Sequence, residues 1–441
     1  MNERKKDNSA TDTTSNVMEK IVSLTKRRGF IFQGSEIYGG LAGTWDYGPL
    51  GVALKNNIKS LWWKRFVEER DDMYGVDAAI LMNEKVWEAS GHVGGFSDPL
   101  VECNKCKKRF RADHLEDKSK CLECGWELSE ERQFNMMFET QVGAQGDTKS
   151  YLRPETAQGM FVNFKNIVDT MRPKLPFGMA QIGKAFRNEI SPRDFIFRTR
   201  EFEQMEIEYF IDEKDWEKQF EYWLREMRKW ISDIGLNKKK VNELEVPGDD
   251  RAHYSKRTVD FEYDFPFGVS ELYGLAYRTD YDLSKHAEHS GEKMVYRDAD
   301  GNEYTPHVIE PTFGVDRTVL AVLSDAYTED EMGGEKRVYL KFTQELAPIK
   351  AAVFPLLKNK PELVSKAREV YEMLKKDVPQ IMWDDNGNVG KRYRRQDEIG
   401  TPKCITIDFD TLEDDTVTVR DRDTGEQERV NIIELSKIVS V

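Results

Sequence analysis

The stretch FRNEISPRDFIFRTREFEQME, residues 186–206, places four arginines among five acidic residues within 21 positions. The arginines are Arg187, Arg193, Arg198 and Arg200, and the acids are Glu189, Asp194, Glu201, Glu203 and Glu206. Pro192 opposes a continuous helix, and the phenylalanines and isoleucines beside the charges favour two strands around a polar loop. Arginines half-buried in such strands need anionic partners. The partners are either the nearby acids or a ligand that carries several negative charges.

Length and composition restrict the classes of protein. A chain of 441 residues is too long for one ordinary core, so we expect two or three domains. Hydrophobic residues make up 39% of the chain, yet no apolar run approaches the length of a membrane span, so we expect no membrane partner. The polar start, residues 1–17, is expected to be a disordered tail. The net charge of −14 argues mildly against a nucleic-acid binder but leaves room for a local basic face.

Four of the five cysteines form two Cys-x-x-Cys pairs, CNKC at 103–106 and CLEC at 121–124. Two such pairs at this separation are typical of a tetrahedral thiolate site. We therefore predict a structural Zn²⁺ ion on Cys103, Cys106, Cys121 and Cys124, with free or redox-active thiols as the alternative. The basic residues beside the pairs are either a solvated face or a ribbon that touches nucleic acid. This cysteine usage favours a reducing cytoplasm over a disulfide framework.

Periodicity gives a coarse order of elements. Helices are expected at 18–30 and 54–69, and a lysine- and glutamate-rich helical stretch runs from about 213 to 240. Strand patterns return at VDFEYDF and ELYGLAYRTDYDL, and an Asp-Gly hairpin turn is expected in DADGN. The stretch VIEPTFGVDRTVLAVLSDAY then predicts a strand, a turn and a helix. From about residue 348 strands and helices alternate, which predicts a small α/β domain.

Together these motifs resemble those of the class II aminoacyl-tRNA synthetases and, more narrowly, the homodimeric glycyl-tRNA synthetases. The resemblance is carried, in order, by SGHVGGFSDPLVEC, LRPETAQG, FRNEISPR, EFEQMEIEYF, RTDYDL and VIEPTFG. It covers nearly the whole chain from about residue 18. It implies an α+β fold, with an antiparallel-sheet catalytic core at 18–347 that carries a zinc-containing insertion at 98–148 and a helical insertion at 212–260. It also implies that residues 348–441 form an α/β anticodon-binding domain.

The activity implied by the resemblance is the joining of glycine to its tRNA. Glycine reacts with ATP, bound with Mg²⁺, to give glycyl-adenylate and pyrophosphate, and is then transferred to the 3′ end of the tRNA. Attack by a carboxylate on a phosphate needs charge neutralisation and alignment more than it needs an acid or a base. The resemblance assigns catalysis to Arg187, Glu189 and Arg317. It assigns ATP binding to Arg187, Glu189, Arg198, Phe202 and Arg317, with Phe202 stacked on adenine.

Glycine has no side chain to grip. A site can hold its ammonium with carboxylates and reject larger amino acids by leaving no room at the α-carbon. The resemblance places Glu155, Glu206 and Glu310 around the ammonium, and adds Arg278 and Thr312 to the glycine site. Three clustered carboxylates are costly without a cation, which favours a functional role. Thr312 departs from the serine common in relatives, which leaves the shape of the pocket open.

Two surfaces are expected to bind macromolecules. In the C-terminal domain, KRYRRQDEIGTPKC surrounds Tyr393 with basic residues, a mixture that suits unstacked anticodon bases. The predicted tRNA-binding residues are Lys391, Arg392, Arg394 and Arg395, with a solvated loop as the alternative. The apolar face of LWWKRF is predicted to form a homodimer interface, with core packing inside one subunit as the alternative. The proline usual in motif 1, the dimer motif of this class, is replaced by Asn83.

Two other functions remain open. An enzyme of the same class could use threonine, proline or histidine, although the three glutamates and the lack of a metal-ligand set in the core weigh against it. A non-catalytic relative is the second alternative. Such relatives tend to lose the motif arginines, whereas Arg187, Glu189 and Arg317 are present here. Pyrophosphate exchange tested with each of the twenty amino acids separates these functions.

Overall fold

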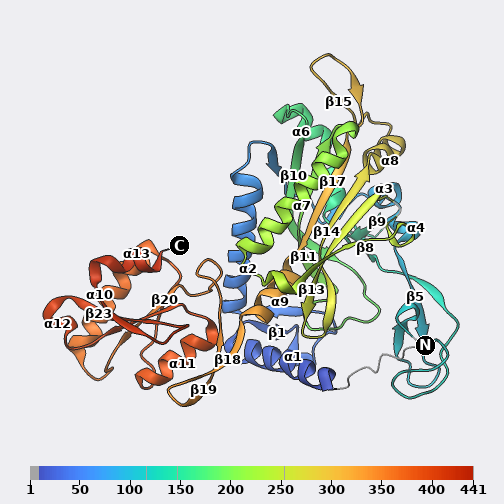
Figure 1. The fold of residues 1–441 in the computed structure, drawn as a ribbon. Helices are drawn as coiled ribbons and strands as arrows, with labels where there is room; N and C mark the ends of the chain where they lie inside the picture. Colours follow the sequence, from blue (N-terminus) through green and yellow to red (C-terminus); the bar gives the residue numbers. More distant parts are fainter. Residues whose placement is uncertain (1–8, 116, 147, 253, 441) are drawn as a thin grey trace, which may run out of the picture.

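The computed structural model describes residues 9–115, 117–146, 148–252 and 254–440. Its centre is a seven-stranded sheet (Figure 1) in the order β12-β13-β14-β17-β11-β10-β3. Neighbouring strands are antiparallel except β10 and β3, which are parallel. The strands are β3 (Met73–Gly75), β10 (Phe177–Phe186), β11 (Glu201–Ile211), β12 (Val241–Glu245), β13 (Arg257–Phe265), β14 (Gly268–Thr279) and β17 (His307–Gly314). The predicted antiparallel core sheet is confirmed.

The alternation of side chains along β11 separates the hydrophobic core from a polar face. Met205 and Ile207 belong to the main hydrophobic core. Gln204, Glu206 and Glu208 are also buried, although all three are polar. Successive side chains on a strand point to opposite faces, so the odd positions face the core and the even positions face the other side of the sheet. The polar face is where the candidate site lies.

Three helices supply the core on the hydrophobic face of the sheet: α2 (Pro49–Trp63), α7 (Trp216–Asp233) and α9 (Val315–Ala326). A π-helical turn, Lys64–Glu68, continues α2. Trp62 and Phe66 are fully buried, and their rings lie 5.9 and 5.5 Å from the ring of Phe313 on β17. The apolar face of LWWKRF is therefore packed against the sheet of its own subunit, and the prediction that this face forms the dimer interface is wrong. Its apolar residues cover the hydrophobic face of the sheet, which must be buried against another element.

The amino-terminal part begins with α1 (Ser9–Arg28), so the helix starts before the range predicted at 18–30. The predicted tail overlaps this helix from Ser9 onward, and its first eight positions, 1–8, lie outside the described residues. β1 (Ile31–Gln33), a 3-10 turn (Glu36–Tyr38) and β2 (Trp45–Tyr47) follow. Asn83, which stands where a proline was expected, caps α3 (Glu84–Ala89) by accepting a hydrogen bond from the backbone N–H of Lys85.

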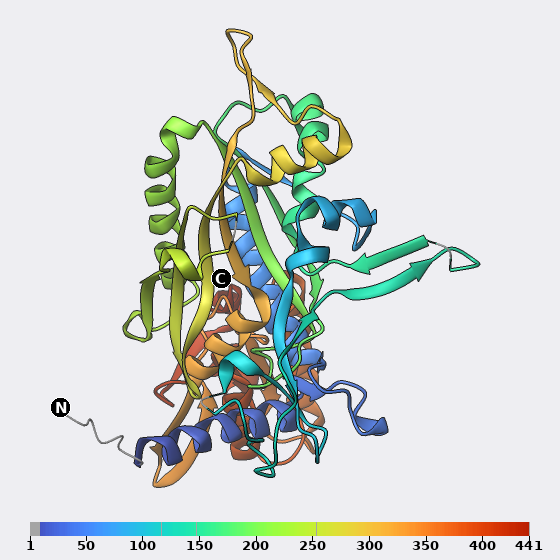
Figure 2. The ribbon, with the colours of Figure 1, turned by 90° about the vertical axis from the view of Figure 1, so that its right-hand side faces the viewer.

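Two small three-stranded sheets are formed by the part of the chain that connects β3 to β10. One contains β4 (Leu81–Met82), β9 (Thr148–Leu152) and β8 (Phe138–Val142), and Figure 2 shows the β8–β9 hairpin projecting from the body of the protein. The other contains β6 (Arg109–Arg111), β5 (Ser97–Glu102) and β7 (Arg132–Asn135) and carries the two cysteine pairs. This second sheet has its own small core, which includes Val101, Ala112 and Leu115. Short helices also occur in this part of the chain: α4 (His92–Gly95), α5 (Ala157–Phe161) and α6 (Phe164–Met171). Residues of α5 and α6 pack against β10 and β11 of the central sheet.

Beyond β14 lie α8 (Tyr281–Ser290) and a hairpin of β15 (Tyr296–Arg297) and β16 (Glu303–Tyr304), which contains the Asp-Gly turn predicted in DADGN. The chain leaves α9 through a second hairpin, β18 (Tyr327–Met332) and β19 (Glu335–Leu340), and enters the C-terminal sheet. No helix among the described residues combines the length and the apolar character that crossing a bilayer requires.

The C-terminal sheet has five strands in the order β21-β20-β22-β23-β24. Its strands are β20 (Ala351–Pro355), β21 (Ile381–Trp383), β22 (Lys403–Ile407), β23 (Thr416–Asp421) and β24 (Gln427–Asn431). Its helices are α10 (Pro361–Asp377), α11 (Val389–Ile399), α12 (Thr411–Asp414) and α13 (Leu435–Val439). Asp397 of α11 binds both Arg337 of β19 and Arg420 of β23, at 3.2 and 2.8 Å. All three side chains are buried, so this ion triad joins the domain to the β18–β19 hairpin.

Candidate active site

A cavity of about 410 Å³ opens on the polar face of the central sheet. Residues of β11, β14 and β17 line it, together with the segment between β10 and β11 and the start of α9. Nine of the residues predicted for ATP or glycine line it: Glu155, Arg187, Glu189, Arg198, Phe202, Glu206, Glu310, Thr312 and Arg317. Segments far apart in the sequence therefore meet at one place.

Two arginines of the cavity have weak partners within the protein. The Nε of Arg187 donates to the backbone oxygen of Pro154 at 3.0 Å, and its guanidinium lies 5.2 Å from the centre of the Phe202 ring. Arg198 lies 3.9 Å from the carboxylate of Glu189. Burial lowers the pKa of Arg198, and the neighbouring arginines lower it further. Because no carboxylate of the described residues lies closer than 3.9 Å to either guanidinium group, an anionic ligand can bind them strongly.

Arg317 lies in the first turn of α9 and enters the cavity beside Phe197. Its guanidinium lies 4.5 Å from the centre of the Phe197 ring. One nitrogen donates to the backbone oxygen of Glu271 at 3.0 Å and lies 3.1 Å from the carboxylate of the same residue. The amino end of a helix favours negative charge, so α9 adds to the pull on an anion.

The acids of the stretch 186–206 mostly pair outside it. Glu203 is bound by Lys55 and Lys59 at 2.9 and 3.0 Å, and Glu201 pairs with a lysine of β10. Within the described stretch, the closest arginine–acid pair is Arg193 with Asp194, at 3.3 Å, and neither lines the main cavity. Of the two alternatives for these arginines, the structure favours a ligand with several negative charges.

Carboxylates gather at the end of the cavity where glycine binding is predicted. Glu155 lies just before α5 and is buried; His92 lies 3.3 Å from its carboxylate, and the side-chain amide of Gln158 donates to it at 3.0 Å. Burial raises the pKa of Glu155, but His92 and Arg278 outweigh that effect and hold the pKa well below its usual range. Glu155 is therefore a charged carboxylate.

Arg278 lies beneath this end of the cavity and is 1% exposed. Both of its outer edges are occupied: Asp282 of α8 accepts two hydrogen bonds, at 2.8 and 2.9 Å, and Glu310 accepts a third at 2.8 Å. The ring of Tyr254 lies 3.8 Å from its guanidinium carbon. Arg278 thus holds Glu310 in place and does not line the cavity.

Glu206 lies between two hydroxyl donors. Thr156 donates to one of its carboxylate oxygens, and Thr312 donates to the other at 3.1 Å. Burial raises its pKa, and the nearby charge of Glu155 raises it further. The hydroxyl that Thr312 shares with serine therefore has a structural task, which is to orient Glu206.

Two residues of the site were missed by the sequence analysis. Glu208 lies two positions beyond Glu206 on the same face of β11, and one of its carboxylate oxygens lies within 4.8 Å of one oxygen from each of Glu206 and Glu310. The period of two along EFEQMEIEYF would have found it. Arg111 of β6 lines the cavity and contacts Asp98 at 2.7 Å. No sequence signal marks Arg111, because its place depends on how the insertion packs.

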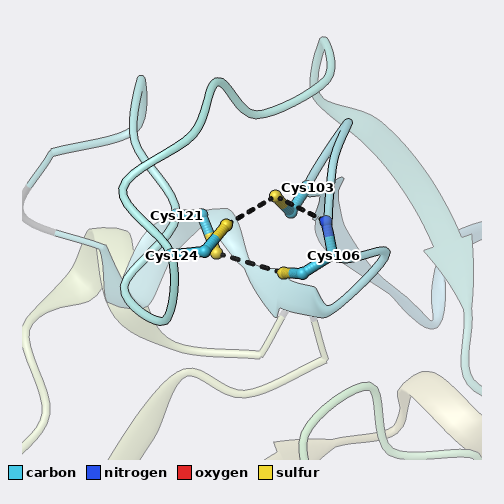
Figure 3. A group of neighbouring side chains, drawn as sticks. All are labelled: Cys103, Cys106, Cys121 and Cys124. Atoms are coloured by element: carbon cyan, nitrogen blue, oxygen red, sulfur yellow. Dashed lines mark hydrogen bonds between the residues drawn. The ribbon is translucent and has the colours of Figure 1, made fainter.

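The four cysteines predicted to bind zinc meet at one point (Figure 3), and all four are free of disulfide bonds. The Sγ atoms of Cys103 and Cys124 lie 3.5 Å apart, and those of Cys106 and Cys121 lie 3.6 Å apart. Zinc–sulfur bonds of about 2.3 Å in a tetrahedron put the sulfurs about 3.8 Å apart, so the four thiols fit such an ion.

The basic residues beside the cysteine pairs are held by acids. Lys108 lies 2.8 Å from Glu123, and Arg109 lies 2.9 Å from Glu102. Of the two alternatives for these residues, the pairing favours the solvated face.

The basic segment of the C-terminal domain is helix α11 rather than the loop considered above. Lys391 and Arg394 are exposed, and Arg395 pairs with Asp384 at 2.8 Å. Arg392 is 1% exposed and donates to the backbone oxygens of three residues, Pro355, Asp385 and Gly387. The prediction that Arg392 contacts tRNA does not fit this burial, because the arginine joins the loop before α11 to β20.

Comparison with known proteins agrees with this architecture. A family model described as "tRNA synthetase class II core domain (G, H, P, S and T)" matches residues 138–326, and one described as "Anticodon binding domain" matches residues 350–441. The glycine–tRNA ligase of Clostridium acetobutylicum is 53% identical, over 95% of this chain and 97% of its own length. The glycine–tRNA ligase of Geobacillus thermodenitrificans is 52% identical, over 96% and 97% of the two chains. At this identity and coverage, the chain belongs to the glycine–tRNA ligase family of class II tRNA synthetases.

Proposed function

We propose that the protein is an ATP-dependent glycine–tRNA ligase, which makes glycyl-adenylate and transfers glycine to the 3′ end of its tRNA. The observation that carries this proposal is the division of one cavity into two ends. Arg187 and Arg198, which have no close acid among the described residues, line one end together with Arg317, and buried carboxylates line the other. A triphosphate and an ammonium group are the two ligands that such ends would attract.

The arginines perform the work of activation in this proposal. Arg187 binds the α-phosphate, where negative charge develops as the glycine carboxylate attacks, and Arg198 and Arg317 bind the outer phosphates. Phe202 offers the face of its ring to adenine. Because these groups are already held by Pro154, Phe197 and the helix α9, little reorganisation is needed when charge develops.

Magnesium fits the arginine end as an ion carried by ATP. Glu189 and Glu271 both line the cavity there and would supply carboxylate oxygens to it. When bound, Mg²⁺ neutralises phosphate charge. Glu271 meanwhile orients Arg317 through their 3.1 Å contact.

The carboxylates select glycine. Glu206 and Glu310 line the cavity and would receive the ammonium, while Glu155 adds negative charge next to them. Thr312 and Arg278 position Glu206 and Glu310 through their hydrogen bonds. Because Glu155, Glu206 and Glu310 are all buried at this end, we infer that a larger amino acid would lack room beside them.

The other parts of the chain have structural and recognition roles in this proposal. A zinc ion on the four cysteines holds the insertion together. Residues 348–441 bind the anticodon through Lys391, Arg394 and Arg395, and their sheet begins at Ala351. We also propose a cytoplasmic location, because the four ligand thiols must stay reduced.

A homodimer remains part of the proposal, although its interface must lie away from LWWKRF. Three exposed apolar side chains in the segment between β1 and β2 support a different surface: Ile37 is 88% exposed, Tyr38 is 86% exposed and Leu41 is 57% exposed. Sedimentation of a Tyr38→Asp variant tests this surface. The variant is expected to dissociate into monomers at a higher protein concentration than the unaltered dimer does. Unchanged association rejects the surface.

Charging of tRNA with labelled glycine is the test of the proposed function. The purified protein, ATP, Mg²⁺ and a total tRNA fraction should give acid-precipitable label that depends on all components. Label that is absent with glycine but present with threonine, proline or serine would assign a different member of the class.

A further inference from the structure

Glu208, on the polar face of the sheet, is a buried carboxylate that lacks hydrogen-bond donors among the described residues. Its side chain is 0% exposed. Neither of its carboxylate oxygens accepts a hydrogen bond from any described residue. One of its oxygens nevertheless lies within 4.8 Å of one oxygen from each of Glu206 and Glu310. Three buried carboxylates from two adjacent strands, β11 and β17, therefore meet behind the proposed glycine site.

The surroundings supply too little positive charge for these acids. The charged and titratable groups around them come from several elements: Arg153 and Glu155 before α5, Arg278 on β14, Asp282 and His286 on α8, and Tyr254. Arg278 is the central cation, but Asp282 already takes two of its hydrogen bonds and Glu310 takes one. The carboxylate of Glu155 lies 3.3 Å from the imidazole of His92. Nothing among the described residues is left to neutralise Glu208 by direct contact.

A proton is the simplest neutralising group. An isolated carboxylate in a dry site is so costly that it takes up a proton, and two carboxylates this close do not both ionise. Burial and the charge of Glu310 raise the pKa of Glu208 well above its usual range. The new O–H group then needs an acceptor, and one carboxylate oxygen each of Glu310 and Glu206 lies within 4.8 Å of an oxygen of Glu208. Arg278 holds one oxygen of Glu310, and Glu310 also lines the cavity.

We propose that Glu208 holds a proton, shared with Glu310, in the glycine-free enzyme, and that the ammonium of glycine displaces this proton into solvent. The inference rests on the proposed function and adds a proton to its binding step. The exchange balances: one positive charge enters the pocket as ammonium, one leaves as H⁺ to the buffer, and no covalent bond to carbon changes. Glu208 acts here as a positioning residue, because it lies behind Glu206 and Glu310 and does not line the cavity.

Glycine affinity should therefore rise with pH. Protons compete with glycine for the same carboxylates, so acidification weakens binding and alkalinisation strengthens it. Release of one full proton gives at most about a tenfold change in dissociation constant per pH unit. Glu208→Gln cannot hold the proton but keeps the shape and a hydrogen-bond donor toward Glu310. The variant should bind glycine with less than about a twofold change across the same range.

Calorimetric titration of the full-length protein with glycine, in buffers of equal pH but different ionisation enthalpy, counts the protons released. The expected result is close to one proton for the unaltered protein and close to none for Glu208→Gln. Glu201→Gln, a change at the exposed start of the same strand, is the matched control and should release as many as the unaltered protein. Equal release by Glu208→Gln and the unaltered protein overturns the assignment to Glu208.

Infrared difference spectra of the unaltered protein, with and without glycine, test the proposal even if the variant does not fold. Glycine should bleach the carbonyl band of a buried carboxylic acid, and a spectrum without that loss overturns the proposal. The proposed function fails separately, through absence of glycine-dependent pyrophosphate exchange. Normal exchange combined with glycine binding that releases no proton rejects only the inference about Glu208.

Discussion

Replacing Arg317 by alanine should slow amino-acid activation strongly while leaving the fold intact. The side chain is 25% exposed, so its contacts with the 50% exposed Glu271 and with the ring of Phe197 lie close to solvent. Such contacts contribute about 1 kcal/mol or less to folding. A preorganised donor aimed at developing charge is worth more, about 2.7–4 kcal/mol, which corresponds to a rate loss of roughly 10²–10³.

The assay is glycine-dependent exchange of labelled pyrophosphate into ATP, measured with circular dichroism and a thermal melt on the same samples. Arg317→Lys keeps the charge but loses the planar fork, so an intermediate loss is expected. Arg193→Ala is the matched control, because Arg193 is 53% exposed, pairs with Asp194 and does not line the main cavity. Exchange within about threefold of the unaltered enzyme in a folded Arg317→Ala protein would refute the role given to this arginine.

The remaining predictions concern metal, tRNA and pH. Protein purified without added zinc should contain one zinc per chain, and Cys121→Ser should lose it. The same variant should raise the KM for ATP, because Arg111 of the same insertion lines the cavity. Metal-free, fully active protein contradicts this. The double change Arg394→Ala and Arg395→Ala should raise the KM for tRNA about tenfold and flatten its salt dependence without altering pyrophosphate exchange, and unchanged charging contradicts it. Burial and neighbouring carboxylates raise the pKa of Asp260 to about 7. The folded state thus binds this proton more tightly than the unfolded state, and the stability it contributes is lost as pH rises through about 7. Asp260→Asn should therefore raise the melting temperature more at pH 8 than at pH 5, and calorimetry showing equal shifts rejects this.

Period and motif order predicted the parts of the site that lie on strands. Glu206 and Glu310 each lie within a strand whose alternate residues are apolar, so their common face follows from the sequence once the two strands are neighbours. The same rule applies to Glu208, which lies two positions beyond Glu206 on the same strand.

Other features depend on packing between distant segments, and local patterns carry little information about them. Arg111 reaches the cavity only because the cysteine-bearing sheet packs beside the segment that follows β10, where Ser191 donates to the backbone oxygen of Arg109 at 3.3 Å. Arg392 was grouped with its basic neighbours, but helix α11 turns it inward while Arg394 stays exposed. A run of basic residues does not show which side chains point inward unless the position of each residue around the helix is known.

Pyrophosphate exchange measured with each of the twenty amino acids in turn tests the central claim most directly. It requires only the cavity, ATP and Mg²⁺, so it is independent of tRNA identity and of the C-terminal domain. The account predicts that glycine supports exchange and that alanine and serine, which need more room beside Glu206 and Glu310, support it at least about a hundredfold less well. Exchange that depends on another amino acid, or on none of the twenty, would contradict the account.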